Sequence, residues 1–272
     1  MGVLLLGLVV LSLVGAERGE AQGPDADWAF SPSTFAELWF HGMAVIDPVG
    51  PGPLPLYDPG YPNTVRSAKS TGGVPPTSLD SRLGYFREAF RSDPAFQVLH
   101  FLPLYFATAG RTEVLTALEV LAETEAGIPT PPSARTAFGL TAVGSVLASA
   151  AQRRVLGEFA QALRSEWDQF FGDCWQERAS ERDALYAETV RVWREDYRVA
   201  LAPILGKMAL SGGTVTIVPA FGIEGRVFGG TPQSAVDNVL MVSAPAEPGN
   251  GHEVVFSMLR ELSFPLVRTA LG

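Results

Sequence analysis

The chain has 272 residues, of which 47% are hydrophobic and 18% are charged, which is enough apolar material for one sizeable core or two small ones and excludes a disordered protein. Its formal net charge is −9, and no basic cluster is longer than Arg153-Arg154, so no nucleic acid is expected as a partner. The single cysteine, Cys174, excludes an internal disulfide and a multi-cysteine zinc site.

The first 21 residues are predicted to be a secretory signal peptide. A Leu/Val-rich run from Val3 to Val14 is too short to span a membrane comfortably. Small residues at Val14-Gly15-Ala16, or alternatively Gly19-Glu20-Ala21, fit a cleavage site. We therefore expect a secreted or periplasmic protein without membrane contact beyond this segment. A retained N-terminal anchor is the alternative.

Residues 22–210 are predicted to be a helical region. Its first helix begins at a Ser33 cap and runs through Phe35 to Ile46. Glu37 and His41 lie four residues apart on this helix. Such a pair either makes a local contact or offers a carboxylate and an imidazole to one metal ion.

The rest of this region alternates between loops and helices. Residues 47–62 are rich in Pro and Gly, which predicts a long loop that is either functional or packed over the core as a lid. Helical patterns then begin at Ser78, Asp93, Thr112 and Ala134, the last predicted to be a buried helix rather than a membrane span. His100 is predicted to be a core histidine with one hydrogen bond. A long helical region from Gln152 to about Leu205 is expected to break at Gly172 and Pro203.

Only near the end of the chain, in residues 211–272, do apolar and polar residues alternate with the period of two that is typical of strands. Residues 214–219 and 225–228 read as strands joined by a turn around Gly222, and residues 238–243 read as a third strand. The predicted fold class is therefore α+β and predominantly α-helical. The helical N-terminal two thirds precede a small antiparallel or mixed sheet and a C-terminal helix.

The C-terminal helix carries the most informative pattern in the sequence. In Leu259-Arg260-Glu261-Leu262-Ser263-Phe264-Pro265-Leu266-Val267, polar residues interrupt an apolar helical stripe. This stretch resembles the active-site helix of zincin metallopeptidases, in which the two histidines of HExxH hold Zn²⁺ and the glutamate is the general base. Arg260 and Phe264 stand at the two histidine positions, and neither side chain can donate a lone pair to zinc.

The resemblance covers about the last seventy residues and implies a zincin-like protein with a degenerate site. Only Glu261 remains of the catalytic triplet, so no zinc or other cofactor is expected. In zincins the edge strand of a small sheet holds an extended peptide by backbone pairing. The first hypothesis is therefore a secreted protein that binds a peptide or protein partner, or has a structural role. Arg260 should then be partly buried and paired with a carboxylate, Glu261 or one from the helical region, and Arg260→Ala should cost about 3 kcal/mol.

Two other hypotheses stay open at this point, and with them the question of enzymatic activity. The first is an active zinc metallopeptidase with ligands from His252, Glu253 or Glu261 and a distant His41 or His100, completed by residues beyond Gly272 if the chain is truncated. The alternative to metal binding at His252 and Glu253 is a structural role at the start of the helix. In that interpretation Asn250 is the N-cap and Glu253 lies in the first helical turn. The second is a non-enzymatic helical module of the bacterial envelope, in which the 214–243 strands would not form a sheet beside helix 253–264.

Overall fold

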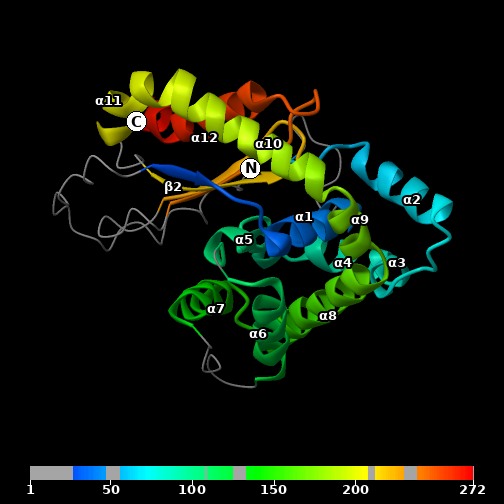
Figure 1. The fold of residues 1–272 in the computed structure, drawn as a ribbon. Helices are drawn as coiled ribbons and strands as arrows, with labels where there is room; N and C mark the ends of the chain where they lie inside the picture. Colours follow the sequence, from blue (N-terminus) through cyan, green and yellow to red (C-terminus); the bar gives the residue numbers. More distant parts are fainter. Residues whose placement is uncertain are drawn as a thin grey trace.

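A computed structural model describes residues 27–46, 56–107, 109–124, 133–207, 212–229 and 238–271 (Figure 1). The predicted signal peptide, residues 1–21, lies outside the described residues. The strands are β1 (Trp28–Phe30), β2 (Gly213–Val218), β3 (Arg226–Phe228) and β4 (Val239–Ser243). The helical elements are α1 (Thr34–Ile46), α2 (Tyr61–Thr71), α3 (Ser78–Ser81), α4 (Leu83–Ser92), η1 (Pro94–His100), α5 (Leu102–Tyr105), α6 (Arg111–Glu123), α7 (Ala134–Val146), α8 (Ala150–Glu166), η2 (Trp167–Phe171), α9 (Gly172–Glu177), α10 (Ala179–Val192), η3 (Trp193–Tyr197), α11 (Arg198–Lys207) and α12 (Gly251–Leu271).

The helical N-terminal region is confirmed, and several helices begin where capping chemistry places them. Ser33 Oγ accepts a hydrogen bond from the Ala36 N–H at 3.2 Å, so α1 begins as predicted. Thr77 and Asp80 form a capping box at the start of α3. The starts of these two helices are therefore set by hydrogen bonds between residues that are close in sequence.

The two predicted breaks in the long helical region are wrong. Gly172 has helical dihedral angles, because the chain passes from α8 through the π-helical turn η2 directly into α9. A Cβ at Gly172 would lie 2.8 Å from the carbonyl oxygen of Trp167, so this glycine accommodates the wide turn and does not end a helix. Pro203 lies inside α11. The actual break is at Arg178, whose φ and ψ are −90° and 10°.

Two helices, α2 and α7, were not predicted correctly, and in both the reason is which side chains are buried. Helix α2 was not predicted, because its only buried side chains are Val65 and Lys69 and no apolar stripe marks it. In α7, Leu140 is buried but Phe138 is 43% exposed, so the helix is half-buried rather than buried. Within the described part of the chain, no helix combines the length and the apolar character needed to cross a membrane.

The four strands form one mixed sheet in the order β1-β2-β4-β3. Strands β1, β2 and β4 are parallel, and β3 is antiparallel to β4. The three predicted strands are found within one residue of their expected limits. Strands β2 and β3 follow each other along the chain but do not pair, because β4 lies between them, and β1 comes from the region predicted to be helical.

Helices cover both faces of the sheet (Figure 1). Val239 and Met241 of β4 belong to the core formed with α1 and the other N-terminal helices. Leu240 and Val242, on the opposite face, belong to a second core with α10 and α12. Every residue of β4 is buried, as expected for a strand covered on both sides. The sheet thus separates two hydrophobic cores.

The close contact between α6 and α8 yields a stability prediction. A Cβ at Gly157 of α8 would lie 2.4 Å from the Cβ of Ala122, so Gly157→Ala must push the helices apart. Overpacking of this kind costs about 1 to 3 kcal/mol, which outweighs the gain in helix propensity. We expect a net loss in the free energy of unfolding, measured by urea denaturation. Gly84→Ala in α4 is the control, since open space surrounds its Cβ, and it should stabilise the protein by up to about 1 kcal/mol.

Candidate functional site

The C-terminal helix α12 starts with its own capping group. Asn250 Oδ1 accepts a hydrogen bond from the Glu253 N–H at 3.3 Å. The carboxylate of Glu253 accepts from the Ala246 N–H at 2.6 Å and therefore ties the preceding loop to the first helical turn. Glu253 and Asn250 therefore have structural partners, as expected for residues at the start of a helix.

His252 lies apart from the other two histidines. Its side chain is exposed on the first turn of α12, with the Tyr197 hydroxyl 3.3 Å from Nδ1 and Asp196 Oδ2 3.8 Å from Nε2. His41 and His100 are buried in the core on the other side of the sheet. His100 receives one hydrogen-bond partner, the Tyr57 hydroxyl at 2.9 Å, as predicted. The three histidines are not brought together.

The predicted pairing of Arg260 is confirmed. Its Nη2 and Nε lie 2.8 and 3.1 Å from Oε1 of Glu261, and its side chain is 35% exposed. The same Oε1 accepts a hydrogen bond from the Gly225 N–H at 2.9 Å. Arg260 also donates to the carbonyl oxygen of Ile223. Together, the two side chains attach α12 to the segment that leads into β3.

Gly225 is the residue that permits this attachment. A Cβ there would lie 2.6 Å from both Glu261 Cγ and the Met241 carbonyl oxygen. The backbone at 225 can therefore approach the buried carboxylate only without a side chain. As a result, the Glu261 carboxylate serves as a fixed hydrogen-bond acceptor for the backbone of the segment before β3.

The donor set around Glu261 does not fit zinc. Arg260 offers only hydrogen-bond donors, and the Glu261 oxygen nearest to it already accepts from two groups. The backbone of Phe264 is part of α12, whereas its side chain lies outside what the structure describes. Throughout the described ranges, no three His, Cys, Asp or Glu side chains are grouped so that they could hold a metal ion.

Strand β3 is an edge of the sheet beside this pair. Arg226, Val227 and Phe228 pair with β4 on one side, and no other described strand pairs with the opposite side. An edge strand presents unpaired N–H and C=O groups that can pair with another extended chain. Helix α12 packs against both β3 and β4. The sheet therefore lies beside the helix.

A second polar site lies within the helical core, around Glu166. Its carboxylate has no exposed surface and lies 2.9 Å from His41 Nε2 and 2.8 Å from Lys69 Nζ. Thr77 donates its hydroxyl proton to the same carboxylate. Lys69 also bonds Asp80 at 2.7 Å, and the Tyr61 hydroxyl lies 3.0 Å from His41 Nδ1. We call these six residues the Glu166 cluster.

The electrostatics of the Glu166 cluster favour an ionised glutamate beside a neutral histidine. Burial alone would raise the pKa of Glu166, but hydrogen bonds from His41, Lys69 and Thr77 lower it to about 2. Burial lowers the pKa of His41, and Lys69 adds to this effect, although the hydrogen bond with Glu166 and the charge of Glu166 act in the opposite direction. Lys69 supplies the positive charge that balances Glu166, so the imidazole can remain neutral.

Glu37 and His41 do not act as a metal-binding pair. His41 points to Glu166 and Tyr61, whereas Glu37 lies near Trp175 and Arg182. Oε1 of Glu37 is buried and has no hydrogen-bond partner among the described residues. Burial raises the pKa of Glu37 to about 7, although Trp175 and the two nearby arginines, Arg182 and Arg178, act in the opposite direction.

Sequence reasoning missed most of the Glu166 cluster. Tyr61 and Lys69 belong to α2, whose pattern gave no helix signal. One usable signal was present in α8, where Leu156, Phe159 and Leu163 mark the buried stripe and Glu166 occupies its next position. A charged residue at a core position predicts a buried partner of opposite charge.

Comparison of the chain with family models, with curated proteins and with solved structures finds no match.

The raised pKa of Glu37 predicts a pH-dependent stability. Because the folded state binds this proton more tightly than the unfolded chain, the stabilising contribution is complete below about pH 4.5 and is lost as the pH rises towards 7. Glu37→Gln should therefore gain up to about 3 kcal/mol relative to the unmodified protein between pH 4.5 and 7. Urea unfolding at both ends of this range measures the difference. If the difference in unfolding free energy between Glu37→Gln and the unmodified protein does not change with pH, the raised pKa of Glu37 is contradicted.

The Arg260–Glu261 pair yields a second prediction. Since Arg260 is about one third exposed, solvent screens the pair, and we expect Arg260→Ala to cost about 1 to 2 kcal/mol rather than the 3 kcal/mol of a fully buried pair. Arg194→Ala is the matched control on an exposed arginine of η3 and should change stability by less than about 0.5 kcal/mol. Equal effects of the two substitutions would show that Arg260 is an ordinary surface residue.

Proposed function

We propose that this protein is a zincin-like binding protein that has no catalytic metal and that holds an extended peptide along the free edge of β3. One observation carries the proposal: Glu261 accepts hydrogen bonds from Gly225 and Arg260, whereas an active zincin would use this carboxylate as a general base on zinc-bound water. The motif that resembles a peptidase site therefore supports the strand beside it.

The geometry at β3 fits peptide binding by strand addition. Glu261 and Arg260 bond the N–H of Gly225 and the carbonyl of Ile223, both just before β3, so they hold the start of the edge strand in place. Rings of Tyr105 and Phe138 lie 5.6 and 5.8 Å from Phe228 and support its other end. An edge strand ordered in advance loses less conformational freedom when a peptide pairs with it.

The proposed location of this function is outside the cytoplasm. The apolar segment from Val3 to Val14, followed by small residues at Ala16 or Ala21, supports export through a cleaved signal peptide. Extended peptides or flexible segments of other exported proteins are then the proposed partners.

Backbone methylation of a bound peptide tests the proposal. A decapeptide selected from a random library for binding to the full chain is resynthesised with a single N-methyl group at each position in turn. Strand addition uses the N–H of every second residue, so methylation should weaken binding by about tenfold at alternate positions within the paired segment and leave the intervening positions unchanged. Fluorescence anisotropy measures the affinities.

Matched proline variants locate the site. Val227→Pro in β3 should abolish peptide binding, whereas Phe30→Pro in β1, the other edge of the sheet, should preserve it, because the ladder with β2 directs the Phe30 N–H away from the sheet. Circular dichroism establishes that both variants remain folded. The proposal fails if methylation has no alternating effect, or if the two proline variants bind equally well.

A further inference from the structure

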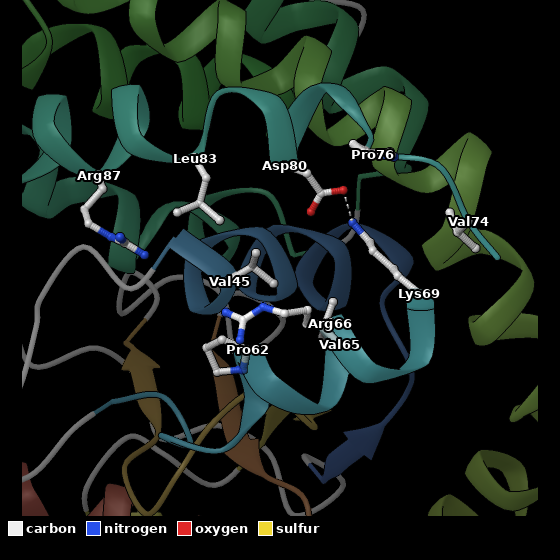
Figure 2. A pocket seen from close by; sticks show the side chains of 10 residues that line it. All are labelled: Val45, Pro62, Val65, Arg66, Lys69, Val74, Pro76, Asp80, Leu83 and Arg87. Carbon is white, nitrogen blue, oxygen red and sulfur yellow. Dashed lines mark hydrogen bonds and ion pairs between the residues drawn. The ribbon is translucent and has the colours of Figure 1, made fainter. Parts of the chain in front are cut away.

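A pocket of about 500 Å³ lies where α1 meets α2, α3 and α4, close to the Glu166 cluster (Figure 2). Its apolar lining comes from Val45, Pro62, Val65, Val74, Pro76 and Leu83. Four charged side chains complete it, namely Arg66, Lys69, Asp80 and Arg87. Its volume is within the range of pockets that bind small organic molecules.

Two of the three cations in this pocket have no carboxylate partner among the described residues. Asp80 is already bonded to Lys69 at 2.7 Å, and Lys69 is further balanced by Glu166. Arg66 bonds only the neutral amide of Asn63, at 3.0 Å. Arg87 donates its Nε–H to the carbonyl oxygen of Ile46 at 2.8 Å, which leaves the two Nη groups of its guanidinium for a ligand.

The guanidinium groups of Arg66 and Arg87 therefore line one pocket in a chain whose net charge is −9. Six other arginines of the described structure do lie within ion-pair distance of a carboxylate, namely Arg82, Arg164, Arg191, Arg198, Arg226 and Arg260. Figure 2 shows the guanidinium groups of Arg66 and Arg87 directed towards Val45 in the middle of the pocket. The pocket thus combines an apolar surface with two guanidinium groups.

From this combination we infer that the pocket binds a small organic anion with an apolar body, of which a medium-chain monocarboxylate is the simplest example. The carboxylate would lie between Arg66 and Arg87, since a guanidinium matches the geometry of a carboxylate and remains charged at all physiological pH values. The hydrocarbon chain would lie on Val45, Val65 and Leu83. This site is separate from β3 and does not depend on the proposed peptide binding.

Calorimetric titration of the full chain with decanoate, below its micelle concentration, tests the inference. Decanol carries the same chain without the charge, and acetate carries the charge without the chain. We expect decanoate to bind at least about tenfold more tightly than either compound, because only decanoate satisfies both parts of the pocket. No binding of decanoate up to about 5 mM, or equal binding of decanol, would overturn the assignment.

Arginine variants place the ligand in the pocket. Arg66→Gln and Arg87→Gln should each weaken decanoate binding by about tenfold or more. Arg154→Gln is the matched control, because Arg154 is an exposed arginine of α8 outside the pocket, and it should leave the affinity unchanged. Arg66 is itself exposed, so its replacement keeps the test valid even if loss of the Arg87–Ile46 hydrogen bond impairs folding. Equal affinities for Arg66→Gln and Arg154→Gln would contradict the proposed site.

Discussion

The buried carboxylate of Glu166 is the constraint on which the helical part of the protein depends. It lies at the last residue of α8, immediately before the π-helical turn η2, and it bonds side chains from α1, α2 and the start of α3. An ionised group without exposed surface is tolerated only when every nearby donor is in place. The positions of these four segments are therefore coupled, and α2 in particular is held by Lys69 rather than by an apolar stripe.

The sheet depends on a second carboxylate in a comparable way. Glu261 is 5% exposed, and its hydrogen bonds with Gly225 and Arg260 connect α12 to the segment before β3. Both carboxylates are thus acceptors that organise neighbouring segments of chain. They differ in their surroundings, because Glu166 is enclosed by helices whereas Glu261 lies next to a strand edge. This difference is why only the second carboxylate supports a proposal about partner binding.

The sequence predicted those parts of the fold that leave a periodic or capping signal. The helix at Ser33, the three strands from 213 to 243 and the partner of Arg260 belong to this group. Strand β1 was missed because three residues are too few to show a period, and α2 was missed because its buried face contains Lys69. The breaks predicted at Gly172 and Pro203 failed because tertiary packing can carry a helix through residues that disfavour it.

The candidate site was only partly predictable for a related reason. Arg260 and Glu261 are adjacent charged residues in a mainly apolar helical stretch, so their pairing followed from the cost of burying an unpaired charge. The acceptor role of Glu261 towards Gly225 depends on a contact across 36 residues, for which the sequence has no local signal. The Glu166 cluster depends on still longer separations, since His41 and Glu166 are 125 positions apart in the sequence.

The most direct test of the account is the zinc content of the untagged full-length chain, purified in the presence of zinc and then desalted for native mass spectrometry. If Arg260 and Glu261 form a structural pair, the protein should carry no zinc, and a chelator should not change its unfolding temperature. One tightly bound zinc ion per chain, whose removal lowers the unfolding temperature, would contradict the central claim that the peptidase-like motif holds the strand edge and not a metal.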